Sequence, residues 1–301
     1  MKKLLFVLTS ISVIAFFIIC PSQAADASLN GIIIWYKNIF PVLFPCVIIS
    51  NIILNTGIMD RLKNSKMMIF ILIACGLGLG FPVGGKLTAD LYRKNYLNYK
   101  QANYMFPLIN NISPSFVASV MLSKCLHMEN LIVISFVILY LPSAVLALYY
   151  GMRYKDKNLN HVKKEAIKTT SRFRINMQII DAEIINGFET LIKLCGYIVI
   201  FSIIVQIIKS ITYNDALIVS IVTGFIEVTN GVISVSKQNI NMELKYILSM
   251  AFASFGGLSC FAQAKSIMED TDINPLNYLS MKIIFASVTV ILSICVLFFI
   301  S

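Results

Sequence analysis

The chain has 301 residues, of which 57% are hydrophobic and only 13% are charged. Soluble domains are about 45–50% apolar and about 25% charged, so this composition excludes an ordinary soluble domain and predicts an all-α polytopic membrane protein. The formal net charge is +10. Its basic residues lie between the apolar runs, where such residues set membrane topology, and they do not indicate nucleic-acid binding.

Apolar runs long enough to cross about 30 Å of hydrocarbon recur along the whole chain. They are 4–20, 39–57, 67–87, 103–122, 131–150, 187–208, 216–235, 246–268 and 278–300. The runs over 67–87 and 216–235 are interrupted by Gly, Pro, Thr or Asn. Basic residues flank the first of these on both sides, so both of its ends are expected in the cytoplasm. We therefore interpret it as a re-entrant hairpin.

The N-terminal run has two possible fates. Lys2 and Lys3 precede it, and Ser22-Gln23-Ala24 after it resembles a signal-peptidase site. Cleavage at that site is one alternative. However, the run is long for a signal peptide and further spans follow it. We therefore expect residues 1–30 to form an N-terminal transmembrane segment, which could serve as a signal-anchor, followed by a short loop.

The longest polar stretch, Met152–Asn176, is rich in Lys and Arg and predicts a basic cytoplasmic linker over 152–186. The linker separates a first repeat, 31–151, from a second repeat, 187–301. Counting spans from a cytoplasmic N-terminus gives the two repeats the same order of elements in opposite orientations. This pattern predicts an inverted repeat, which many secondary transporters share.

Short motifs recur in the two repeats at nearly the same separation. GFPVG at 80–84 is followed by NNISP at 110–114, and EVTNG at 227–231 is followed by GGLSC at 256–260. Non-helical backbone at membrane depth survives only where protein buries it or where it lines a wet cavity. We expect hairpin and helix breaks at Gly80, Pro82, Gly84, Gly85, Pro114, Gly231, Gly256 and Gly257.

Polar side chains gather at these expected breaks, close to helix N-termini whose free N–H groups favour anions. The expected substrate-binding residues are Lys86, Thr88, Asn110, Asn111, Ser113, Thr229, Asn230, Ser259 and Gln263. Glu227 lies between apolar neighbours and is expected to couple a proton or cation, because a charge inside the membrane usually faces a cavity or a partner. The alternative for Lys86 is that its side chain extends back to the cytoplasmic surface.

Other kinds of site find little support. Gly80, Gly85 and Lys86 have the spacing of a phosphate-binding loop, but Leu87 stands where such a loop needs Ser or Thr. The seven cysteines form no C-x-x-C pair, and only two histidines occur. We therefore expect no metal site, no cofactor and no enzymatic activity.

Motifs across nearly the whole chain resemble one known family. They are G-x-x-x-W-x-x-x-x-x-P-x-L-x-P at 31–45, GFPVGGKLTADL at 80–91, NNISP at 110–114, EVTNG at 227–231 and FGGLS at 255–259. Together they resemble the sporulation integral membrane proteins of the YlbJ (SpoVV) type, in the nucleoside-recognition or Gate-domain group. The resemblance implies re-entrant hairpins and broken helices similar to those of concentrative nucleoside transporters, and an uncleaved N-terminal region.

The same resemblance implies a function, namely transport of dipicolinic acid across the outer forespore membrane during sporulation. Lys86 would then neutralise a carboxylate of this small dianion. The alternatives are a carrier of nucleosides, nucleobases or other small solutes, and a non-transporting sporulation scaffold. The expected partners are a small anionic solute and the lipid bilayer, with no nucleic acid, and the oligomeric state stays open. The expected location is the cell membrane or the outer forespore membrane of a spore-forming bacterium.

Overall fold

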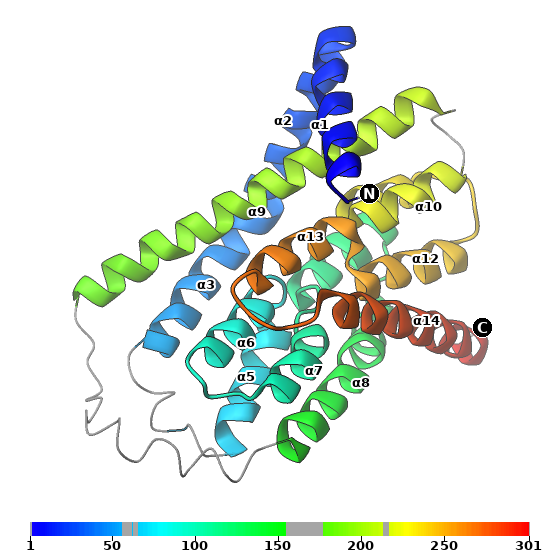
Figure 1. Cartoon of the computed structure of the whole chain (residues 1–301). Coiled ribbons are helices and arrows are strands. Elements are labelled where there is room, and N and C mark those ends of the chain that lie inside the picture. The colour runs from blue at the N-terminus through cyan, green and yellow to red at the C-terminus, as the bar shows by residue number, and fades with distance from the viewer. Residues whose placement is uncertain (1, 56–61, 63–65, 155–176, 213–216, 301) are drawn as a thin grey trace.

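The computed structural model describes residues 2–55, 62, 66–154, 177–212 and 217–300. Within these ranges the chain is almost entirely helical and has no strand, so the all-α prediction is confirmed (Figure 1). The first half contains α1 (Lys2–Ile19), α2 (Pro21–Ile34), the π-helix η1 (Trp35–Ile39), α3 (Phe40–Asn55), α5 (Lys66–Leu79), α6 (Val83–Arg93), α7 (Tyr99–Ile109), the π-helix η2 (Phe116–Leu126), the 3-10 helix η3 (Glu129–Leu131) and α8 (Ile132–Arg153). The second half contains α9 (Met177–Ile211), α10 (Leu217–Ile226), α11 (Val228–Ser236), α12 (Met242–Phe255), α13 (Gly257–Met268) and α14 (Pro275–Ile300).

Several helices have the length and hydropathy to cross a membrane. In the described part of the chain four do so by themselves: Glu129–Arg153, Met177–Ile211, Met242–Met268 and Pro275–Phe299. A fifth span arises if the pair Thr9–Ile19 and Pro21–Ile39, bent by 117°, counts as one. The outer faces of α8 and α14 are apolar, since Val133, Leu141, Ile284 and Phe298 are each more than half exposed. Exposed apolar surfaces of this kind must contact lipid or another protein, as those of a multi-pass membrane protein do.

Two long helical segments cross each other in opposite directions (Figure 1). The first comprises α2, η1 and α3, which follow one another without a break, and the second is α9. A Cβ on Gly31 would lie 3.0 Å from the Cα of Val199, and one on Gly187 would lie 3.1 Å from Ile48. Because α2 already begins at Pro21, the prediction of a short loop before Gly31 is wrong. Pro21 lies in the first turn of α2, where its missing N–H costs no helical hydrogen bond.

The first interrupted run forms a helical hairpin of α5 and α6. The chain turns at Gly80–Pro82, and Gly76 and Gly84 then face one another, each with a Cβ position within 3.2 Å of the other's Cα. Gly80 has φ +75°, and a Cβ there would lie 2.5 Å from the Cα of Ser113. Only glycine fits this position, so the break expected at Gly80 and Pro82 is present.

The second interrupted run forms a matching hairpin of α10 and α11, which turns at Glu227. Gly224 and Gly231 lie face to face, and a Cβ on Gly231 would be 2.0 Å from the Cα of Gly224. Some expected breaks are wrong, because Gly84, Gly85 and Gly231 lie inside helices. These glycines allow close helix contacts: a Cβ on Gly84 would lie only 2.1 Å from the carbonyl oxygen of Ile109.

Each hairpin is followed by a broken span. In the first half α7 ends at Ile109 and helical structure resumes at Pro114, with non-helical backbone between them. In the second half α12 ends at Phe255, and Gly256 and Gly257 have φ values of +86° and +75°. The breaks expected around Pro114 and at the two glycines are therefore present, and Figure 1 shows α13 leaving α12 near the centre of the molecule.

The predicted linker over 152–186 is helical at both ends. Met152 and Arg153 complete α8, and Met177–Asn186 forms the first turns of α9. Apolar residues at helical spacing extend α9 there, although Asp181 and Glu183 interrupt the apolar run. The rest of the predicted linker, 155–176, lies outside the described residues.

Basic residues gather at one end of the bundle, which we call the basic end and define by Lys66, Arg93, Lys100 and Arg153. The cap of α7 reaches the end of α8, since the Gln101 side chain donates a 2.7 Å hydrogen bond to the carbonyl of Gly151. Gly151 also packs against Ile69 near the start of α5. Arg93 donates to the carbonyl of Ile267 at the end of α13 (2.7 Å). The predicted linker is joined to this same end, because α8 ends there.

Candidate binding cavity

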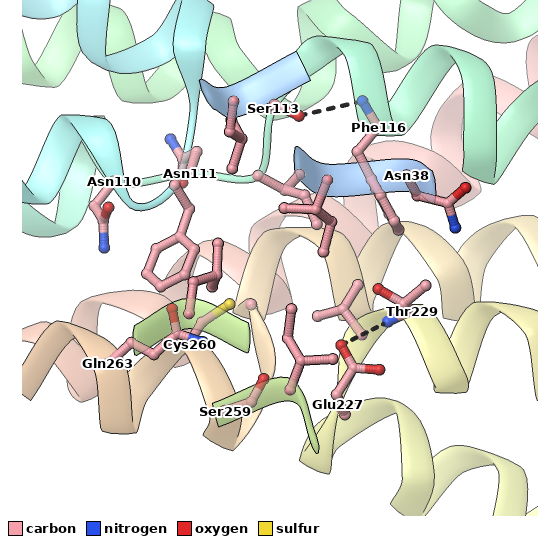
Figure 2. Close-up of a pocket in the computed structure, with 18 of the residues that line it drawn as sticks. Asn38, Asn110, Asn111, Ser113, Phe116, Glu227, Thr229, Ser259, Cys260 and Gln263 are labelled. Atoms are coloured by element: carbon pink, nitrogen blue, oxygen red, sulfur yellow. Dashed lines mark hydrogen bonds between the residues drawn. The ribbon is translucent and has the colours of Figure 1, made fainter. Parts of the chain in front are cut away.

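A cavity of about 80 Å³ lies where the helix breaks of the two halves meet. Asn110, Asn111 and Ser113 border it on one side, and residues of the second half face them from the other side (Figure 2). The polar or reactive residues that line it are Asn38, Asn110, Asn111, Ser113, Ser115, Glu227, Thr229, Ser259, Cys260, Gln263, Tyr278 and Lys282. Phe81 and Phe116 are among its apolar walls. The structure thus brings most of the expected site residues together.

The first-half side of the cavity is held by amide hydrogen bonds. The Asn110 side chain accepts from the N–H of Gly85 (3.1 Å) and donates to the Tyr278 hydroxyl (3.4 Å). The Asn111 side chain donates to the carbonyl of Leu108 (2.7 Å), which closes the end of α7. Through these hydrogen bonds the two asparagines hold the non-helical backbone in place, and part of each side-chain amide still faces the cavity.

Glu227 occupies the N-terminus of α11. Its Oε1 accepts from the N–H of Thr229 (3.1 Å) and its Oε2 from the N–H of Asn230 (2.7 Å). A carboxylate in this position satisfies two unpaired N–H groups and interacts favourably with the helix dipole. The helix terminus that could attract an external anion is therefore already capped by the protein's own carboxylate. Figure 2 shows the bond from Thr229 and the second carboxylate oxygen beside the cavity.

The sequence interpretation missed Lys282, and it also missed Asn38, Cys260 and Tyr278 of the cavity lining. Lys282 lies in α14 and is only 2% exposed, and its Nζ donates a 2.5 Å hydrogen bond to Oδ1 of Asn111. The same ammonium lies 5.7 Å from the centre of the Tyr278 ring. In the described part of the chain no carboxylate lies within 4.0 Å of it. The available signal was a single lysine inside the apolar run 278–300, since a charge at membrane depth indicates a functional site.

Lys86, the expected anion contact, lies outside this cavity. Its Nζ donates a 3.1 Å hydrogen bond to the Thr190 hydroxyl of α9, and it lines a separate polar cleft between α6 and α9. The side chain is on the face of α6 that turns toward α9, whereas the cavity lies on the side of the hairpin turn. The prediction that Lys86 lies in the cavity is therefore wrong, and its side chain lines the neighbouring cleft.

Two further expected residues do not reach the cavity. Thr88 is fully buried and its hydroxyl donates to the carbonyl of Gly84 (2.8 Å), one helical turn earlier. Asn230 points toward α9, where its side chain donates to the Ser202 hydroxyl (3.2 Å). Asn230 directly follows the cavity residue Thr229, but the rotation of the helix turns its side chain away. Thr88 lies two turns along α6, beyond the reach of the cavity.

The start of α13 supplies the remaining polar wall. Ser259, Cys260 and Gln263 follow the break at Gly256, and all three line the cavity (Figure 2). Gln263 is 5% exposed, and its side-chain amide has no hydrogen-bond partner among the described residues. Its hydrogen-bonding groups are thus available to a solute or to water.

The comparison with known proteins agrees with the motifs. The chain is similar to "Sporulation integral membrane protein YlbJ" of Bacillus subtilis (strain 168), at 24% identity over 296 residues that cover 84% of this chain and 72% of the relative. This similarity supports the YlbJ-type assignment. With the apolar helices described above, it identifies a multi-pass integral membrane protein and indicates a role in sporulation. No family model and no solved structure matches this chain.

Proposed function

We propose that the protein is a membrane transporter of a small anionic metabolite, with dipicolinate as its expected substrate, in the outer forespore membrane. The observation that carries the proposal is Lys282, a buried lysine beside a cavity where the broken helices meet. A buried charge is costly unless it is paired. The single close partner of Lys282 in the described ranges is the neutral Asn111 amide, so an anionic solute would supply the missing charge.

The arrangement of helices supports a transporter built from an inverted repeat. Each half contains a long opening segment, a glycine-packed hairpin, a broken span and a closing helix in the same order. The two opening segments, Pro21–Asn55 and α9, run in opposite directions where they cross. Secondary transporters with inverted repeats bind their substrates near the repeat interface, at broken helices. We also propose that each repeat is Gate-like and that the fold resembles that of concentrative nucleoside transporters.

The cavity chemistry suits a planar dicarboxylate. Lys282 would bind one carboxylate through a charge-assisted hydrogen bond. Side-chain amides and hydroxyls of Asn110, Ser259 and Gln263 would serve the other polar atoms, and the Tyr278 and Phe116 rings would contact the pyridine ring. Transport by alternating access would further require the two sides of the cavity to move apart in turn.

Glu227 gives the proposal a test of ion coupling. Glu227→Gln keeps one oxygen that can accept from the α11 N-terminus but cannot gain or lose a proton. We expect uptake by this variant to lose its stimulation by an imposed proton gradient. The weaker cap should cost about 0.5–2 kcal/mol of stability. Glu243→Gln, at an exposed position in the first turn of α12, is the matched control and should behave as wild type. Unchanged stimulation in Glu227→Gln would contradict the coupling role.

The function itself is tested by flux of radiolabelled dipicolinate in proteoliposomes, with proton and sodium gradients imposed in turn. Saturable uptake that nucleosides do not compete with is the expected result. Uptake that nucleosides abolish would instead indicate the nucleoside carrier. Absence of flux for any solute would favour the scaffold, in which case deletion of the predicted basic linker should remove the sporulation function.

A further inference from the structure

A polar cleft lies between α6, α9 and α13, next to the central cavity. It consists of two adjoining hollows of about 310 and 430 Å³, each larger than the cavity. Both hollows are lined by Lys86, Asp90, Arg93, Thr190 and Lys193. Walls with this many charged groups are expected to hold water, so the cleft is a hydrated region within reach of the cavity.

Only a thin partition separates the cleft from the cavity. Leu194 of α9 and Gln263 of α13 line both spaces. At the hairpin turn Phe81 lines the cavity, and its neighbour Pro82 lines the cleft. A movement of one or two side chains at this partition would join the two spaces.

The cleft opens at the basic end of the bundle. Its outer wall includes Arg93 and Lys94 at the end of α6, and Glu183 and Asn186 in the first turns of α9. The sequence also attaches the Lys- and Arg-rich stretch Met152–Asn176 to this end. Loops with an excess of Lys and Arg lie on the cytoplasmic side, so the cleft faces the cytoplasm.

Two lysines with no ion pair in the described ranges line the cleft: the partly buried Lys86 of α6 and the exposed Lys193 of α9. Asp90 pairs with Arg93 at 2.9 Å, and the Glu183 carboxylate accepts from the Asn186 side chain at 3.1 Å. The bond of Lys86 is to a neutral hydroxyl, that of Thr190. Asp270 and Glu189 also line the cleft, so its walls carry both signs and its selectivity depends on which charge lies nearest the partition.

We propose that this cleft is the cytoplasmic access route to the central cavity, with Leu194 and Gln263 as the movable partition and Lys86 as the residue that favours anions. The inference rests on the proposed function for the identity of the solute, but the route is a property of the protein alone. The cavity also reaches the surface at Ser115, which is exposed, so the experiment must separate two routes.

Cys260 lies in the cavity wall and reports on both routes. A variant that keeps Cys260 and replaces the other six cysteines with alanine is placed in right-side-out and inverted membrane vesicles. We expect an impermeant anionic thiosulfonate to modify Cys260 from the cytoplasmic side. Thr190→Trp, which narrows the cleft, should slow this reaction strongly. Ile192→Trp on the exposed face of α9 should leave it unchanged.

Charge selectivity gives a second readout on the same variant. The anionic reagent should react faster than its cationic analogue, and Lys86→Gln should reduce that preference about 10-fold, the lower end of the range for charge-lined clefts. The control Lys265→Gln, at an exposed position, should leave that preference unchanged. Failure of Cys260 to react from the cytoplasmic side, or an equal rate in Thr190→Trp, overturns the route. Protection of Cys260 by dipicolinate tests the proposed function separately, so a route without protection refutes the substrate and leaves the route standing.

Discussion

Lys282→Met should reduce dipicolinate uptake at least about 10-fold, the factor that corresponds to losing a charged hydrogen bond of about 1.5 kcal/mol. Methionine fills a similar volume but offers no charge to a carboxylate. It also removes a buried ammonium with no carboxylate within 4.0 Å in the described ranges, so the variant should be as stable as wild type or more stable. Uptake into proteoliposomes and thermal unfolding in detergent, measured on the same preparation, separate the two effects.

The matched control for this substitution is Lys265→Met on α13, where the lysine is exposed. It removes the same charge from the same half of the protein and should leave uptake unchanged. Lys282→Arg keeps the charge and should retain more activity than Lys282→Met, although the larger guanidinium must fit a buried position. Wild-type uptake by Lys282→Met would remove the main support for an anion site.

Gly231→Ala should destabilise the protein by at least about 3 kcal/mol, at or above the upper end of ordinary overpacking, because backbone and not a flexible side chain blocks the new methyl group. The added Cβ would lie 2.0 Å from the Cα and 2.7 Å from the nitrogen of Gly224. Gly84→Ala should have a comparable effect, since its Cβ would lie 2.1 Å from the Ile109 carbonyl oxygen. The measurement is the thermal midpoint of the purified protein and its elution as a single species.

Gly196→Ala provides the control for both hairpin substitutions. Gly196 lies within α9, and beyond its own helical turns no atom of the described residues lies within 4 Å of its Cβ position. Alanine there should be neutral or should stabilise the helix by up to about 1 kcal/mol. If Gly231→Ala and Gly196→Ala melt at the same temperature, the two helices of the second hairpin do not pack as closely as described.

Much of the fold followed from composition and from the positions of glycine and proline. The apolar runs predicted helices, and the interruptions at Gly80, Pro82, Gly256 and Gly257 predicted where the helices turn or break. The helix that begins at Pro21 was not predicted. The apolar run ends at Cys20 and the residues after it are polar, which suggested a loop there. The roles of Gly84 and Gly231 were not predictable either, since a break and a close contact select the same residue for different reasons.

The cavity was predictable only in part, and the reason is rotation about helix axes. Asn110, Asn111, Glu227, Ser259 and Gln263 were singled out because they lie near breaks, and the structure brings them together. Lys86 and Thr88 lie just as near a break in sequence, but they project from other faces of α6. Lys282 lies far from any break in sequence and reaches the cavity through packing of α14 on α7. Long-range packing of this kind leaves no local pattern in the sequence.

The most direct test of the account is binding of radiolabelled dipicolinate to the purified protein. The account predicts saturable binding at a single site, competition by unlabelled dipicolinate but not by its uncharged diamide, and loss of binding in Lys282→Met. Equal competition by the diamide, or equal binding by wild type and Lys282→Met, would contradict the assignment of the central cavity as an anion site.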